Sequence, residues 1–115
     1  MAFVTIEDQT LTVKLSLSEK VESLRFHDLE FKLSNIDDVY VTQRPFDELS
    51  GLRVGTGLPN VLCVGTWYSA DGAIFAAIHG ITDGLVVSLK NERISKIVIT
   101  TDNALETAHA IRQQI

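Results

Sequence analysis

The segment from Arg53 to Pro59 holds the residues best suited to binding an anion. Gly55 and Gly57 flank Thr56, and successive backbone N–H groups in a glycine-rich turn can surround a phosphate or carboxylate. Arg53 would add positive charge to such a site. A P-loop is excluded, because no Lys-Ser/Thr pair follows and Pro59 removes a donor where a helix would have to begin. We predict a structural turn here, with an anion site as the alternative.

Other residues that could act in catalysis or metal binding are isolated. Cys63 lies among apolar residues of a predicted strand, where a thiol is usually buried and inert. His27, His79 and His109 are too widely spaced for a recognisable metal motif. We therefore expect no catalytic residues, no metal site and no cofactor.

Two adjacent aromatic residues, Trp67 and Tyr68, lie on a predicted strand. Successive strand residues point to opposite faces, so one ring should enter the core and the other should face solvent or a partner. We predict that the exposed ring marks an interface.

Charge and cysteine content narrow the classes of partner. The chain has 115 residues and a formal net charge of -5, which is the wrong sign for a nucleic-acid-binding surface. The acidic Glu7 and Asp8 in the first predicted hairpin, and only three clustered basic residues (Lys90, Arg93 and Lys96), argue against direct membrane binding. A single cysteine, and no signal-like or membrane-spanning segment, lead us to expect a cytoplasmic protein.

Hydrophobic periodicity predicts a mostly β single domain over residues 1–115. Alternating apolar residues run from Leu11 to Leu17, and Phe3 to Ile6 would form a hairpin with them. Seven or eight strands are expected in all, over residues 3–6, 11–17, 29–33, 39–41, 61–68, 74–79, 85–89 and 97–100. Residues 51–59 are predicted to be a loop.

Three short segments are predicted to be helical. Ser18 would cap one or two turns with Val21 and Leu24 at helical spacing. Pro45 would open a short turn that ends before Gly51. The chain would end in a helix that Asp102 caps and whose apolar face is formed by Ala104, Ala108, Ile111 and Ile115. A curled antiparallel sheet or partial barrel, closed by this helix, would cover the strand edges.

This order of elements resembles the pleckstrin homology (PH) superfold. The run Arg53-Val54-Gly55-Thr56-Gly57-Leu58-Pro59-Asn60-Val61, the following Val64-Gly65-Thr66 and a Thr-Asp-led terminal helix resemble bacterial proteins with PH-like domains, over roughly residues 33–115. Asn60 stands where the pattern has glycine, and both residues tolerate positive φ. The resemblance implies a scaffold that hosts lipid, peptide or self-association sites.

We therefore expect a non-enzymatic, PH-like binding or self-assembly module of the bacterial cytoplasm. Its partner would be a protein or a second copy of the chain, because residues 51–115 are apolar and carry no net charge. The alternative is a small-molecule or anion-binding protein, enzymes included, that uses Arg53 and the Gly55 to Gly57 segment beside His79.

Overall fold

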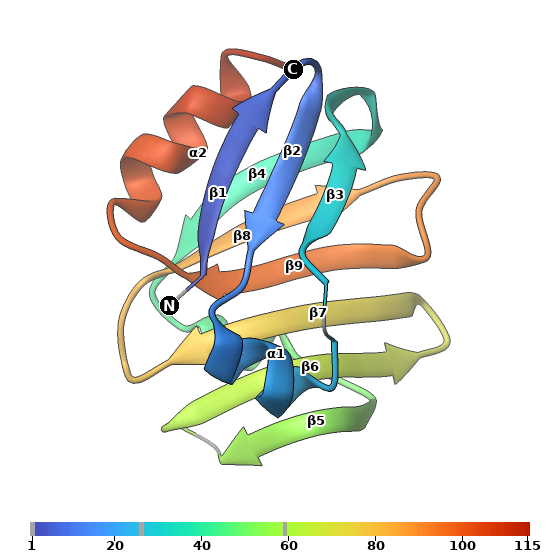
Figure 1. Cartoon of the computed structure of the whole chain (residues 1–115), viewed down its shortest axis with the longest axis vertical. Coiled ribbons are helices and arrows are strands. Elements are labelled where there is room, and N and C mark those ends of the chain that lie inside the picture. Colours follow the sequence, from blue (N-terminus) through green and yellow to red (C-terminus); the bar gives the residue numbers. More distant parts are fainter. Residues whose placement is uncertain (1, 26, 59) are drawn as a thin grey trace.

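The computed structural model describes residues 2–25, 27–58 and 60–115 and places them in two β-sheets with a C-terminal helix (Figure 1). The helices are α1 (Leu17–Ser23) and α2 (Ala104–Arg112), and two short 3₁₀ helices are η1 (Leu33–Asn35) and η2 (Pro45–Glu48). The strands are β1 (Phe3–Glu7), β2 (Thr10–Lys14), β3 (Leu29–Lys32), β4 (Ile36–Thr42), β5 (Leu52–Leu58), β6 (Leu62–Ser69), β7 (Gly72–His79), β8 (Gly84–Leu89) and β9 (Ile94–Thr100).

The smaller sheet has the order β1-β2-β3, and the larger has the order β4-β8-β9-β7-β6-β5. In Figure 1 the strands of the smaller sheet lie in front of the larger sheet and run across its strands. All neighbouring strands are antiparallel except β7 and β9, which are parallel. The chain passes from β7 to β8, leaving room for one strand between them, and β9 then fills that place.

The predicted mostly-β class with a C-terminal helix is confirmed, but the predicted sheet closure is wrong. The two sheets do not join into a barrel, and nine strands are described where seven or eight were predicted. Alternation of apolar residues identifies strands without specifying which edges meet. The parallel pair and the separate three-stranded sheet therefore left no signal in the sequence.

Both faces of the larger sheet are buried, and β7 shows this most clearly. Phe75 and Ala77 point into the main core between the two sheets, whereas Ala76 and Ile78 point into a second apolar cluster on the opposite face. Phe46 and Leu49, from η2 and its end, cover that second cluster. Ala108 and Ile111 of α2 complete the main core.

The first helix begins earlier than predicted. Ser16, not Ser18, caps α1, since Glu19 accepts a hydrogen bond from the Ser16 N–H while its own N–H donates to Ser16 Oγ. The shifted start turns Val21 and Leu24 outward and buries Glu19.

The C-terminal helix is confirmed with different ends. Asn103, in the left-handed conformation, precedes it where Asp102 was predicted. Ala104, Ala108 and Ile111 are buried as predicted, whereas Ile115 lies beyond the helix and is exposed.

The predicted loop over residues 51–59 is instead a strand along residues 52–58. All seven residues of β5 pair with β6, and Gly55 lies directly opposite Gly65. Cross-strand pairing here outweighs the low strand propensity of glycine. The turn that follows includes Asn60, with φ of 65°, while Pro59 lies outside the described residues.

Candidate functional site

The predicted site residues lie on β5 and β6, but on opposite faces of the sheet. Arg53, Gly57 and Trp67 are on the face of the second apolar cluster. Thr56 faces α1, where its Oγ1 donates to the Glu22 carbonyl at 3.1 Å. Tyr68 lies on that same side, paired with Leu52. Because residues 52–58 form a strand and not a loop, the predicted site residues lie on two faces of the sheet and do not form one site.

Arg53, Gly57 and Trp67 line a cavity of about 220 Å³ together with Phe46, Leu49 and Cys63. We call this the Arg53–Trp67 pocket. The Arg53 side chain lies across Gly57, and Nη1 donates to the Gly57 carbonyl at 3.1 Å. The walls of the pocket are mostly apolar. Its one positive charge is the exposed guanidinium of Arg53, which already donates a hydrogen bond to a backbone carbonyl.

Cys63 is not an activated nucleophile in this pocket. Burial raises the pKa of its thiol and outweighs the lowering by a Leu58 backbone hydrogen bond and by the charge of Arg53. A thiol with a raised pKa stays protonated at neutral pH, and the thiol is a poor nucleophile. The pocket therefore offers shape and one positive charge rather than covalent chemistry.

Hydrogen bonds among Tyr40, Glu48 and Lys96, which the sequence analysis did not predict, hold η2 near this pocket. Glu48 Oε1 accepts from Tyr40 Oη at 2.9 Å and from Lys96 Nζ at 3.0 Å. Burial alone would raise the pKa of Glu48, but the bonds from Lys96 and Tyr40 lower it below 4.5. Burial, then the hydrogen bond and charge of Glu48, raise the pKa of Tyr40 to about 12. No local pattern joins these residues, since they come from β4, η2 and β9.

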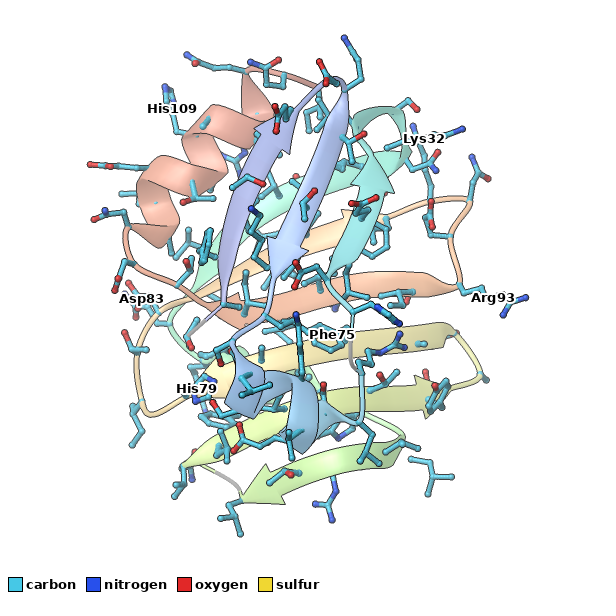
Figure 2. All side chains as sticks on the ribbon, viewed as in Figure 1. Lys32, Phe75, His79, Asp83, Arg93 and His109 are labelled. Atoms are coloured by element: carbon cyan, nitrogen blue, oxygen red, sulfur yellow. The ribbon has the colours of Figure 1, made fainter. Side chains whose placement is uncertain are left out.

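His79 lies on the other face of the larger sheet from Arg53, so the two do not form the predicted joint site. Its Nε2 is 3.0 Å from Oε2 of Glu19, whose side chain is fully buried. Figure 2 shows His79 beside α1. The S-x-x-E spacing of Ser16 and Glu19 could have identified the helix cap, but not the contact with a strand 60 residues away.

Apolar side chains are exposed on both α1 and the edge strand β5. Leu17, the first residue of α1, is 79% exposed, and Leu52, the first residue of β5, is 74% exposed. The two elements are in contact, as the bond from Thr56 shows. We call this the β5–α1 surface, formed by Leu17, Val21, Leu24, Leu52, Val54 and Leu58.

The two edges of the larger sheet differ in how they are covered. At the β4 edge, Nε of Arg112 on α2 donates to the Val39 carbonyl at 3.0 Å, and Nη2 of the same guanidinium bonds the same oxygen. At the other edge, β5 pairs with β6 alone in the described part of the chain. One edge is thus covered by α2, whereas the other has no further strand beside it in the described ranges. At that edge Arg53 bonds the Gly57 carbonyl of its own strand, and apolar side chains are exposed.

Of the two adjacent aromatic residues, Trp67 is 8% exposed and Tyr68 is 48% exposed, which agrees with the predicted division between core and surface. Tyr68 lines a second, larger groove of about 790 Å³ beside β3.

Among the described residues, no group of three or more His, Cys, Asp or Glu side chains could hold a metal ion. No helix in the described ranges is both long and apolar enough to cross a membrane. Comparison of the chain with protein-family profiles, with curated proteins and with solved structures finds no match.

Proposed function

We propose that this chain is a non-enzymatic, PH-like module of the bacterial cytoplasm that assembles with a second copy of itself through the β5–α1 surface. The observation that carries the proposal is the contrast between the two edges of the larger sheet. Arg112 bonds a backbone carbonyl at the β4 edge, whereas β5 pairs only with β6 among the described strands and bears exposed Leu52, Val54 and Leu58. An exposed apolar edge strand is a ready template for pairing with another chain, and most proteins protect such edges with charges, proline, bulges or a covering element.

A second copy is the partner that this edge fits best. Two identical edge strands can pair antiparallel about a twofold axis, because each then supplies the donors and acceptors that the other lacks. Arg53 is the only charged residue in β5, so the copies would meet there with little repulsion. The net charge of -5 over the whole chain disfavours other contacts between copies.

The PH-like part of the proposal is supported at the level of architecture. A small sheet crosses a larger one, and a C-terminal helix packs between them near one edge, in contact with β4 and β8. The parallel β7–β9 pair is a departure from an all-antiparallel arrangement.

The second candidate is binding of a small anion in the Arg53–Trp67 pocket, favoured by a cation placed beside an indole ring in a 220 Å³ cavity. A carboxylate there would have to compete with the Gly57 carbonyl for Arg53. If Arg53→Ala melts like the parent and acetate or phosphate stabilises only the parent, anion binding would replace self-assembly as the leading function.

Self-assembly is tested by measuring mass in solution at tens of micromolar, by light scattering with sizing chromatography. We expect the parent to be a dimer and Leu52→Lys with Val54→Lys to be a monomer, because two charges would be buried in the interface. Leu105→Lys is the matched control: Leu105 is 74% exposed on α2, which packs on β4 and β8 at the opposite edge of the larger sheet, and its substitution should leave the dimer intact. A monomeric parent, or equal dissociation by Leu105→Lys, would contradict the proposal.

A further inference from the structure

The groove beside β3 is distinct from the surfaces described above, because it lies between the smaller sheet and one end of the larger one. Its walls are β3, the β6–β7 turn and the β8–β9 turn, and both turns lie near the outer edge of β3 (Figure 1). Leu29, Glu30 and Phe31 all line it, although successive strand residues point to opposite faces. The groove therefore runs along the backbone edge of β3 rather than over one face.

That edge carries backbone groups without a strand partner. β3 pairs with β2 alone among the described strands. The Leu33 N–H donates to the Gln9 carbonyl, on the β2 side, at 2.9 Å. Because backbone direction alternates along a strand, the N–H and C=O groups of Phe31 also point to β2, and those of Glu30 and Lys32 point away from it. Glu30 thus presents a donor and an acceptor toward the groove.

Arg25 supplies a positive charge at one end of this edge. Its Nε donates to Thr66 Oγ1 at 3.1 Å, and its guanidinium carbon lies 5.8 Å from the centroid of the Phe75 ring. These two contacts hold the half-buried side chain in place. In the described part of the chain its terminal amino groups have no acceptor, so the two-pronged donor is available to a ligand that enters the groove.

The acidic residues of the groove do not neutralise Arg25. Asp28 accepts from the Leu15 N–H at 3.0 Å and lies 3.6 Å from Lys20 Nζ. Glu92 accepts from Asn35 Nδ2 at 2.8 Å. Together with the exposed Glu30, they make a polyanion a poor ligand and favour one carboxylate among otherwise neutral or basic groups.

We propose that this groove binds an extended peptide segment that adds to the edge of β3 and places one carboxylate, from an acidic side chain or a chain terminus, on Arg25. Backbone hydrogen bonds to Glu30 and Lys32 would set the direction of the peptide, and Arg25 would select the acidic position. The site does not depend on self-assembly, since β3 belongs to the other sheet.

The test is an NMR titration of the isotope-labelled chain with the capped peptide acetyl-KVTEVTK-amide. Its central Glu supplies the carboxylate that should bind Arg25. Its other charged residues are lysines, so the peptide brings no second negative charge close to Glu30. We expect saturable shifts of the β3 amides and of the Arg25 Nε–H signal, and affinity at least about tenfold weaker for the same peptide with Gln in place of Glu. A free chain terminus is distinguished by repeating the titration with the Gln peptide left uncapped at its carboxyl end.

Two variants and one control complete the experiment. Arg25→Gln should bind the Glu and Gln peptides equally, and Glu30→Pro should abolish binding by removing the outward N–H, a substitution that an edge position tolerates. Arg93→Gln is the control, because Arg93 lines the groove but projects away from the sheets (Figure 2). Absence of shifts at millimolar peptide, shifts confined to other strands, or unchanged Glu selectivity in a folded Arg25→Gln variant would overturn the proposal.

Discussion

At the residue scale, Gly55 and Gly57 stand two positions apart on β5, yet their substitution should have different effects. Gly55 has φ of 136°, and a Cβ there would lie 2.5 Å from the Val64 carbonyl oxygen. Gly57 has an ordinary φ, and its nearest neighbour is the movable guanidinium of Arg53. The positive φ that favours glycine is therefore required at Gly55 and not at Gly57.

We predict that Gly55→Val lowers the free energy of unfolding by about 3 kcal/mol or more, since backbone strain and a fixed backbone clash add together. Gly57→Val should cost less than about 1 kcal/mol, because only the exposed Arg53 side chain must move. Urea unfolding of both variants measures the difference. Equal losses would show that β5 does not have the described backbone.

Tyr40 should make stability depend on pH in the alkaline range. Its pKa is raised from 10.0 to about 12, first by burial and then by Glu48, so the folded chain holds the phenol proton more tightly than the unfolded chain. This contribution is complete below pH 10 and is lost as the pH rises from 10 to 12. Tyr40→Phe should remove that part of the decline in urea-unfolding experiments. The same slope in parent and variant would contradict the burial of the phenol and its contact with Glu48.

At the scale of elements, the α1 cap allows a matched test. Ser16→Ala should lower the free energy of unfolding by about 1 kcal/mol, because it removes the side-chain oxygen that accepts from the Glu19 N–H. Ser18 lies inside the helix, and its exposed Oγ is 3.2 Å from Ser16 Oγ, so Ser18→Ala should change the free energy of unfolding by less than Ser16→Ala, about a few tenths of a kcal/mol. Thermal unfolding of the pair decides which serine is the cap, and a larger loss for Ser18→Ala would reverse the assignment.

Local patterns predicted elements well where burial follows a regular period. The alternation around Leu11 and Val13 identified β2, and the spacing of Ala104, Ala108 and Ile111 identified α2. The same reasoning predicted α1 but not its cap or its buried face, since Val21 and Leu24 are exposed and the buried residues are Glu19 and Ser23. It failed for β5 because glycines suggest a loop, whereas pairing with β6 makes them part of a strand.

At the scale of the whole molecule, local sequence patterns did not predict which site residues lie together. Arg53 and Trp67 share a pocket because they are direct cross-strand partners, whereas Thr56 and Tyr68 lie on the other face of the sheet. The contacts of Tyr40 with Glu48, of His79 with Glu19 and of Arg25 with Thr66 join distant segments. Such pairs depend on strand order, which local periodicity does not specify.

We propose interactions at two edges of the molecule, one on each sheet. The outer edge of β5 is apolar and suits a second copy, while the outer edge of β3 lies beside a polar groove that contains Arg25. We expect Leu58→Lys, at the opposite end of β5 from the Leu52–Tyr68 pair, to leave peptide binding at β3 unchanged, and Arg25→Gln to leave the mass in solution unchanged. NMR titration and light scattering of each variant would measure this independence.

The central claim, that β5 pairs with β5 of a second copy, is tested most directly by NMR on a sample mixed from labelled and unlabelled chains. Contacts recorded only between labelled and unlabelled protons report the interface between copies. We predict intermolecular contacts among Leu52, Val54 and Leu58 and their neighbours on α1, in an antiparallel pattern about a twofold axis. Intermolecular contacts confined to other strands, or none at a concentration where the parent is a dimer, would contradict the account.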